Sequence, residues 1–349
     1  MKNGNKPIIL LNSRRKIYIT MAIFKIKVKN DYELEQNKLK RGMEVDVFTT
    51  LPTVTVYGGI EIKKSIEAKY SIQVYGTGWN TETTLEIEKL DENNLINLEL
   101  EHQFLKIEKT RFVKAQFFEE VSNIRDYEKR LINKIDIIKT NNKMKQELLK
   151  IYTERQNDFK RIIDLFPDND LAGPFLISPN EIYSKQPNPL MIIGQETNGW
   201  NYNVDDLEKQ MKVYEDFNVG IEYYSSPFWN VTRKLEKALG NEAYSCAWTN
   251  FSKYDVDAGR AHGEQEKEIS TLDNLLEKEI EILKPKICIL FTGPNFDHRI
   301  NKTFENVEFI EVNGFSTREI SQLKHKSLPE LTFRTYHPNY LRRSGMEED

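Results

Sequence analysis

The second half of the chain contains five short apolar runs, each bounded by Gly, Pro or Asn. They occupy residues 190–193, 246–249, 287–292, 307–312 and 331–336. Apolar runs of this length with turn residues at their ends are typical of buried strands. The stretches 204–214, 230–239 and 266–283, which lie between the runs, have helical spacing. Alternating strands and helices predict an α/β domain with a mostly parallel sheet, which we place at residues 144–349.

Polar residues follow four of these runs directly. They are Gly194-Gln195-Glu196-Thr197-Asn198, Asn250, Gly293-Pro294-Asn295 and His337-Pro338-Asn339. In sheets of this kind, ligands bind beyond the carboxyl ends of the strands. We therefore expect the four clusters to converge on one site.

The composition excludes several classes of protein. The chain has 349 residues and a net charge of -4, so a large non-specific nucleic-acid surface is not expected. Its apolar segments are all shorter than the roughly 20 residues that cross a bilayer, and the run 7–11 is too short for a signal peptide, so we expect a cytoplasmic protein without membrane association. The two cysteines, Cys246 and Cys288, fall inside predicted strands as buried thiols. The histidines lack the spacing of a zinc site, and no metal is predicted.

The first half of the chain has a different organisation. Residues 1–20 are expected to be a disordered extension, because Met21 opens a strand-like segment and is a natural start. Residues 21–92 alternate with period two at 24–28, 43–48 and 84–88, with a helical stretch at 59–70, and predict a small β-rich domain. This segment resembles small uncharacterised domains of bacterial mobile elements and phages. The resemblance implies no activity, and a protein partner is the expected ligand.

Residues 93–143 are charged, with apolar residues near heptad spacing, and predict a helical connector. A helix that packs on its own domain is favoured over a partner-binding coiled coil, because the run is short.

The polar clusters of the second half resemble the motifs of the uracil-DNA glycosylase superfamily, in order and in approximate spacing. Gly194 to Trp200 stands where the family has a Gly-Gln-Asp-Pro-Tyr or Gly-Glu-x-Pro-Gly loop. The segment His337-Pro338-Asn339-Tyr340-Leu341 is similar to the final His-Pro-Ser-x-Leu motif. Between them, Trp248 to Lys253 is similar to a strand that ends in a base-reading Asn, and Pro227-Phe228 to a segment whose ring stacks on the base.

The resemblance implies a three-layer α/β/α fold with a mostly parallel sheet. It also implies a DNA glycosylase-like hydrolase that removes uracil or another altered base from DNA by water attack at the N-glycosidic bond, with no cofactor. Cleaving this bond builds positive charge on the sugar and negative charge on the departing base. By resemblance, Glu196 orients the water and stabilises the cationic sugar, and His337 donates a hydrogen bond to the base oxyanion.

The remaining roles that the resemblance implies concern binding. Base-binding residues are Gln195, Asn250, Phe228 and Trp200. DNA-binding residues are Asn339, Leu341, Arg342 and Arg343, with Leu341 as the wedge that fills the gap left by a flipped nucleotide. The DNA partner is single- or double-stranded. From the sequence itself, Lys324, Lys326 and Arg334, which lie near these residues, could extend a basic lip or could be scattered solvated charges.

The sequence departs from the family's pattern at several positions, among them Gly199, which with Asn198 replaces a Tyr-His or Pro-Gly pair. Glu196 is one methylene longer than the usual Asp, Thr197 replaces the loop Pro, and Asn198 stands where a bulky side chain screens out thymine; Asn339 replaces Ser. A second function therefore stays open, in which the domain is a non-catalytic base- or nucleotide-binding module of a mobile element or host-defence system. In a third, the β-rich domain binds a partner and the second half is a scaffold.

Each motif also has a purely structural interpretation. Thr197 or Asn198 could cap a helix, and Glu196 could be the acidic residue of a first helical turn. Asn250 could be a capping residue, and Phe228 could belong to the core. Tyr336-His337-Pro338 could be an extended pre-proline segment that ends a strand.

Overall fold

The computed structural model describes residues 8–12, 15–19, 22–29, 32–34, 37–49, 62, 66, 69–70, 85–89, 95–114, 118–167, 171–200 and 204–346. These residues form two compact units, Met1–Lys139 and Thr140–Asp349. The boundary lies inside the long helix α4 (Phe118–Glu154). Each unit has its own hydrophobic core.

The first unit contains short antiparallel sheets. The strands are β1 (Ile8–Asn12), β2 (Arg15–Ile19), β3 (Ala22–Val28), β4 (Tyr32–Leu34), β5 (Asn37–Leu39), β6 (Glu44–Thr49) and β7 (Leu85–Lys89). They pair as β1-β2, β4-β5 and β6-β3-β7. Strands β3, β6 and β7 lie where the period-two alternation predicts strands, and β1 and β2 lie in the predicted extension 1–20.

The core of the three-stranded sheet is formed by alternate residues. Phe24, Ile26 and Val28 of β3 are buried, whereas Lys25 and Lys27 between them are exposed. Within the predicted helix 59–70, residues 62, 66, 69 and 70 are helical, and the others lie outside the described residues. The sheet therefore buries one face, as period-two patterning requires.

The helical connector is a pair of helices, α3 (Leu95–Lys114) and α4. Leu98 and Leu105 of α3 pack against Ile124, Leu131 and Ile135 of α4. Of the heptad-like apolar residues of this stretch, Ile124, Leu131 and Ile135 are thus buried within their own unit. Beyond the boundary, α4 continues to Glu154 and is followed by α5 (Gln156–Leu165).

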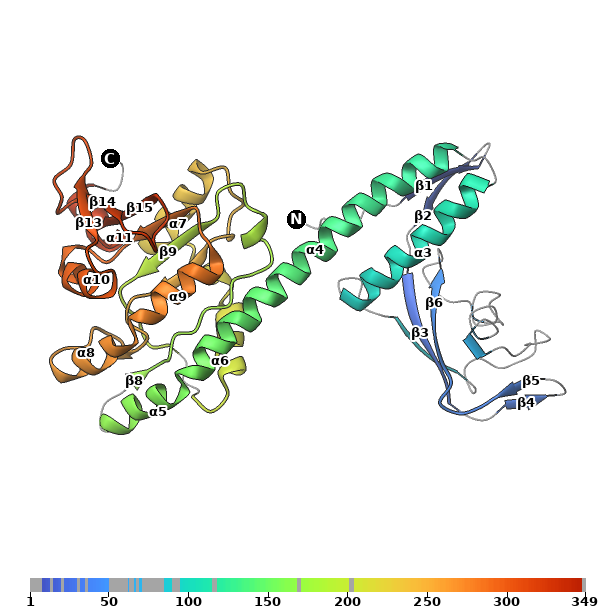
Figure 1. Cartoon of the computed structure of the whole chain (residues 1–349), viewed down its shortest axis with the longest axis horizontal. Coiled ribbons are helices and arrows are strands. Elements are labelled where there is room, and N and C mark those ends of the chain that lie inside the picture. Colours follow the sequence, from blue (N-terminus) through green and yellow to red (C-terminus); the bar gives the residue numbers. More distant parts are fainter. Residues whose placement is uncertain are drawn as a thin grey trace. The chain divides into compact units, whose positions relative to one another are not determined.

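The second unit is built on a six-stranded, mostly parallel sheet (Figure 1). Its strands in spatial order are β10 (Ala247–Asn250), β9 (Leu190–Gly194), β12 (Ile287–Leu290), β15 (Leu331–Thr335), β14 (Ile320–Lys324) and β13 (Glu308–Glu311). The first four are parallel, and β14 is antiparallel to both of its neighbours. The prediction of an α/β domain with a mostly parallel sheet is confirmed, although the sequence did not predict β14.

Helices connect these strands and cover the sheet. They are α6 (Leu207–Phe217), α7 (Pro227–Ala238), α8 (Glu264–Ile269), α9 (Asn274–Leu283), α10 (Asp297–Thr303) and α11 (Pro338–Ser344), with short 3-10 turns η1 (Tyr183–Lys185), η2 (Asn218–Tyr223), η3 (Ser270–Leu272) and η4 (Pro294–Phe296). A two-stranded sheet pairs β8 (Leu171–Ala172) with β11 (Asp255–Val256). All five residues of β9 are buried, so both faces of the sheet are covered at its centre.

A buried ion pair fixes the segment that follows β10. Lys253 Nζ lies 2.7 Å from Glu279 Oε1 of α9, and both side chains are fully buried. Tyr152 of α4 donates to the same carboxylate at 2.8 Å, as does Thr249 of β10. Two hydroxyls and an ammonium therefore satisfy this carboxylate, and the network holds the carboxyl end of β10 in place.

The strand order places a topological switch point between β9 and β12. The chain leaves β9 for β10 at one edge of the sheet, whereas it leaves β12 for β13 at the opposite edge. Because the connections diverge, a crevice opens beyond the carboxyl ends of these two strands, and this is where open α/β sheets bind ligands.

Candidate functional site

An aromatic cavity of about 400 Å³ lies at the carboxyl ends of β9 and β10. Its aromatic lining residues are Trp200, Phe217, Tyr223, Phe228, Trp229 and Trp248. The six side chains to which the sequence assigns catalytic or base-binding roles all line this cavity: Gln195, Glu196, Trp200, Phe228, Asn250 and His337. They come from four separate segments, so the expected convergence of the motifs is present in the fold. We call this the base cavity.

Asn250 lies deep in the base cavity opposite Gly194. The two residues are paired between β10 and β9, and Asn250 is 1% exposed. A Cβ at position 194 would lie 2.2 Å from Asn250 Oδ1. Glycine is therefore required at position 194 because any side chain would clash with the Asn250 amide. A left-handed backbone is not the reason. Asn250 Nδ2 has no hydrogen-bond partner among the described residues.

Other buried polar atoms that line the base cavity are also unpartnered within the described part of the chain. They are Glu196 Oε2, Trp200 Nε1 and Trp248 Nε1. Leaving a buried donor or acceptor unpaired costs about 1–3 kcal/mol, so a cluster of such atoms calls for an explanation. A ligand that carries both hydrogen-bond acceptors and donors would satisfy them.

Asp255 organises the loop that carries Glu196. Its Oδ2 accepts hydrogen bonds from the Thr197 hydroxyl, from Gly199 N at 3.1 Å and from Trp200 N at 3.2 Å. Asp255 is fully buried. Ser252 N also donates to the Gln195 carbonyl at 2.8 Å. The structural alternatives are therefore wrong for this loop: Glu196, Thr197 and Asn198 do not lie at a helix end, since α6 begins at Leu207 with Asp206 as its cap.

Burial raises the pKa of the Glu196 carboxyl to about 7, and the charges of Asp255 and Glu266 act in the same direction. The guanidinium groups of Arg260 and Arg299 oppose this increase. Arg299 forms a buried pair with Asp273, with Nε 2.9 Å from Oδ2. A carboxyl that titrates near neutral pH is suited to accept a proton from water.

His337 ends the segment after β15 and caps α11. Its Nδ1 accepts a hydrogen bond from Asn339 N at 3.2 Å. Burial lowers the pKa of the imidazole, and the charge of Arg343 lowers it further. The ring is therefore neutral near pH 7, and because Nδ1 accepts, Nε2 carries the proton and is the donor. The backbone at His337 is extended, as the pre-proline interpretation predicts.

Phe228 lies in the first turn of α7, which begins at Pro227 and is capped by Ser226. Its ring centroid lies 5.7 Å from that of His337 and 6.0 Å from that of Trp248. Phe228 is half-buried whereas Trp229 beside it is buried, so one ring presents a face to the cavity and the other supports the wall.

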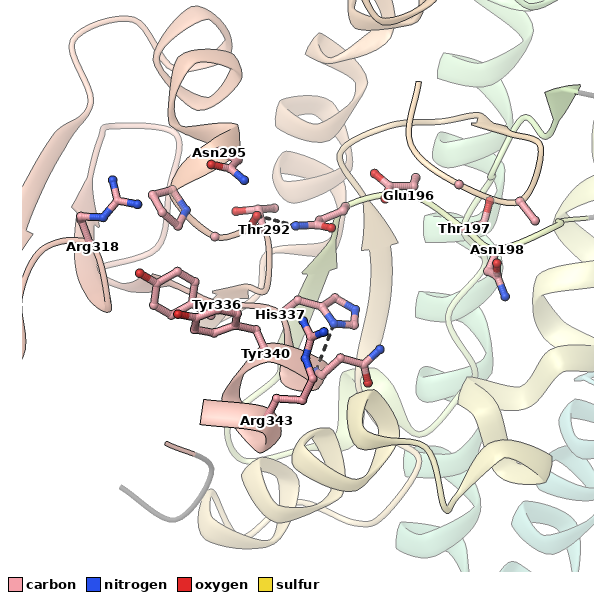
Figure 2. A pocket seen from close by; sticks show the side chains of 16 residues that line it. Glu196, Thr197, Asn198, Thr292, Asn295, Arg318, Tyr336, His337, Tyr340 and Arg343 are labelled. Atoms are coloured by element: carbon pink, nitrogen blue, oxygen red, sulfur yellow. Dashed lines mark hydrogen bonds between the residues drawn. The ribbon is translucent and has the colours of Figure 1, made fainter. Parts of the chain in front are cut away.

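A polar groove of about 720 Å³ adjoins the base cavity and shares the loop Gln195–Asn198 and His337 with it. In Figure 2 the side chains of Glu196, Thr292 and Asn295 lie along one side of the groove, and those of Tyr336, Tyr340, His337 and Arg343 along the other. Gln195 Nε2 donates to the Thr292 carbonyl at 2.7 Å and joins the ends of β9 and β12. Asn339 and Arg343, two of the predicted DNA-binding residues, line this groove. We call it the polar groove.

The other two predicted DNA-binding residues line neither space. Leu341 is only 9% exposed, on a helix that packs against α7. Arg342 is exposed. Arg334, which the sequence places on a basic lip, is 1% exposed and has its Nε 2.9 Å from Asp297 Oδ1. Arg334 therefore holds α10 to the sheet and does not extend the lip.

Sequence reasoning assigned no role to Trp248, Asp255, Tyr336, Tyr340 and Arg318, although all five lie at the site. For Trp248 a signal exists, because it stands two residues before Asn250 on the same strand and so faces the same side. For Asp255 and Arg318 no local pattern was available, since Asp255 lies on the two-residue strand β11 and Arg318 on the turn between β13 and β14.

The described residues contain no group of three or more His, Cys, Asp or Glu side chains that could hold a metal ion. Cys246 and Cys288 are buried, and burial raises the pKa of both thiols. Within the described part of the chain, no helix is both long and apolar enough to span a bilayer.

Comparison with known proteins gives information on the first unit alone. Residues 21–84 match a family model described as a family of unknown function (DUF6140). The match lies within residues 21–92, which the sequence predicts to be a β-rich domain. The family description names no activity. No curated protein matches the chain.

Proposed function

We propose that the second unit is a uracil-DNA glycosylase-like, three-layer α/β/α domain that removes uracil or another altered base from DNA. The observation that carries this proposal is the convergence of Glu196, Asn250 and His337 on one aromatic cavity. An acid, an amide and a neutral imidazole donor are the groups that water attack at an N-glycosidic bond needs.

The flipped base would enter the base cavity and lie against the Phe228 ring. Asn250 offers an amide to the hydrogen-bonding edge of the base, and its unpartnered Nδ2 would gain an acceptor. Trp248 Nε1, also unpartnered, would donate to a second acceptor. A keto base presents acceptors of this kind, which supports uracil and related altered bases as ligands.

The chemical step breaks the bond between C1′ and the base, and the base leaves with the electron pair. His337 Nε2–H stabilises the negative charge that develops on the base oxygen. Ionised Glu196 faces the positive charge on the sugar and accepts a proton from the attacking water, whose oxygen bonds to C1′. That proton finally passes to the released base, so that the products are the free base and an abasic site.

Base release from oligonucleotides tests this proposal. Strands that carry uracil, thymine, hypoxanthine or oxidised bases are incubated with the full chain, and free base and abasic product are measured. We expect release of at least one altered base by wild type and a loss of 100-fold or more in Glu196→Gln. Release from none of the substrates, or equal release by Glu196→Gln, would contradict the proposal.

A second candidate is a module that binds a base or nucleotide without cleaving it. The features that would hold a base, namely Asn250, Trp248 and Phe228, do not depend on Glu196. Saturable binding that survives Glu196→Gln, with no abasic product from wild type, would favour this candidate.

A further inference from the structure

The polar groove contains an aromatic pair next to two exposed arginines. The ring centroids of Tyr336 and Tyr340 lie 4.4 Å apart with an interplanar angle of 37°. Tyr340 is 43% exposed, although a large aromatic side chain on a helix is ordinarily buried. An exposed ring supported from behind by a second ring is a platform on which a nucleobase can stack.

Two arginines border this platform. Arg318 and Arg343 line the groove, and both are exposed. Neither guanidinium forms an ion pair with another of the described residues. Arg318 lies near enough to Asp297 for its charge to oppose the increase that burial causes in the pKa of that carboxyl, but it makes no ion pair with it. On a chain whose net charge is -4, two exposed guanidinium groups at one groove are a local cationic site that suits phosphates.

The apolar side chain that would fill the gap in duplex DNA is buried in this structure. Extracting a base from a duplex leaves a gap, and enzymes that do so insert an apolar side chain to fill it. Leu341, which the resemblance assigns to this task, is buried where α11 meets α7. In a single strand no gap forms, and unstacking a base costs least.

We propose that the polar groove binds single-stranded DNA beside the flipped nucleotide, with a neighbouring base stacked on Tyr340 and its phosphates held by Arg318 and Arg343. This inference rests on the proposed function, because the groove opens onto Glu196 and His337. It adds a strand preference and assigns roles to three residues outside the base cavity.

Binding measured without catalysis tests the inference. The fluorescence anisotropy of a labelled oligonucleotide, single-stranded or annealed to its complement, is followed during titration with the full chain. We expect at least 10-fold tighter binding of the single strand. Tyr340→Ala should weaken single-strand binding roughly 10-fold, whereas Tyr340→Phe, which keeps the ring, should bind as wild type does.

Matched controls separate the groove from the general surface. Tyr224→Ala removes another exposed tyrosine, 68% exposed, that lines neither the groove nor the base cavity, and should leave binding unchanged. Arg343→Gln should weaken binding and reduce the slope of log affinity against log salt concentration by about 1. Binding of the duplex as tight as that of the single strand, or equal effects of Tyr340→Ala and Tyr224→Ala, would overturn the inference.

The two proposals fail in different ways. If altered bases are released from duplex as fast as from single strands, the strand preference is wrong and the glycosylase function stands. If single strands bind through Tyr340 but no base is released, the groove is right and the glycosylase function is wrong.

Discussion

Two cavities lie at opposite ends of the same parallel strands, and they differ in the state of their polar atoms. The polar groove at the carboxyl ends of β9 and β12 has a volume of about 720 Å³. At the amino ends, where Pro189 precedes β9 and Leu283 precedes β12, a cavity of about 700 Å³ lies between α4 and α9. Volume alone would therefore rank the two ends of the sheet as equals.

The charged groups at the amino-end cavity are mostly paired with each other. Lys278 Nζ lies 3.7 Å from Glu154 Oε2, and Lys143 Nζ lies 3.9 Å from Glu147 Oε1. Among its described lining residues, no buried side-chain polar atom lacks a partner. At the carboxyl ends, Glu196, Trp200, Trp248, Asn250 and Thr292 each have such an atom. The comparison teaches that unpartnered buried polar atoms, more than empty volume, mark the candidate site.

The largest effect is expected for His337→Asn, which removes the imidazole donor but keeps a side chain that can cap α11. Because one lost oxyanion donor costs 10²–10³ in rate, base release should fall by about 100- to 1,000-fold. Glu281→Gln, at the amino-end cavity, is the matched control and should release base at the wild-type rate. If both variants lose the same activity, the two ends of the sheet do not differ in function.

Gly194→Ala tests whether the amide of Asn250 must lie where it does. The added Cβ would lie 2.2 Å from Asn250 Oδ1, so the amide has to move. A displacement of roughly 1 Å at a reacting site can cost about 100-fold, and we expect a loss of that size in kcat/KM. Circular dichroism and thermal unfolding are the controls for folding. A folded variant with wild-type kcat/KM would show that Asn250 does not read the base.

The pH dependence of base release follows from Glu196. Its pKa is raised to about 7 and the reaction requires the ionised form, so kcat/KM should increase about 10-fold per unit up to pH 7 and level off above it. Above pH 7 His337 adds no further change to this profile, because burial lowers its pKa below the ordinary 6.5 and leaves the ring neutral there. A flat profile between pH 5 and 8 would exclude Glu196 as the proton acceptor.

The smallest effect concerns stability. The pKa of Glu196 is higher in the folded chain than its ordinary value of 4.5, because ionising the buried carboxyl costs more free energy than ionising it in the unfolded chain. The free energy of unfolding is therefore unaffected below pH 4.5 and decreases as the pH rises through 7. Glu196→Gln removes this loss and should raise the free energy of unfolding by about 1–2 kcal/mol at pH 8, with little difference at pH 4.5. Glu281→Gln should change it by less than about 0.5 kcal/mol at either pH. Chemical denaturation at the two pH values measures both variants.

Much of the sheet could be predicted from sequence because its strands are buried on both faces. Strands β9 and β12 are runs of apolar residues and every residue of β10 is buried, and parallel strands of this kind place their carboxyl ends together. The convergence of Glu196, Asn250 and His337 followed from that geometry. Strand β14 escaped prediction because one of its two buried residues is Ser321, which breaks the hydrophobic alternation.

The exposure of individual side chains could not be predicted, because it depends on contacts between distant segments. Leu341 and Tyr340 are neighbours on one short helix, yet the first packs toward α7 and the second faces the polar groove. The sequence around Arg334 and Arg343 does not distinguish their roles, but Arg334 is buried in an ion pair with Asp297 and has a structural role. Asp255 orders the Glu196 loop across 55–58 residues of sequence, a separation at which no local pattern exists.

The central claim is that the carboxyl-end cavity, and not its amino-end counterpart, holds a nucleobase. A crystal structure of Glu196→Gln with a single-stranded oligonucleotide that carries the base released fastest by wild type tests it most directly. We predict the base against Phe228, within hydrogen-bonding distance of Asn250, with the His337 Nε2 directed at a base oxygen. A base bound between α4 and α9, or a strand that crosses the polar groove with the base cavity empty, would contradict the account.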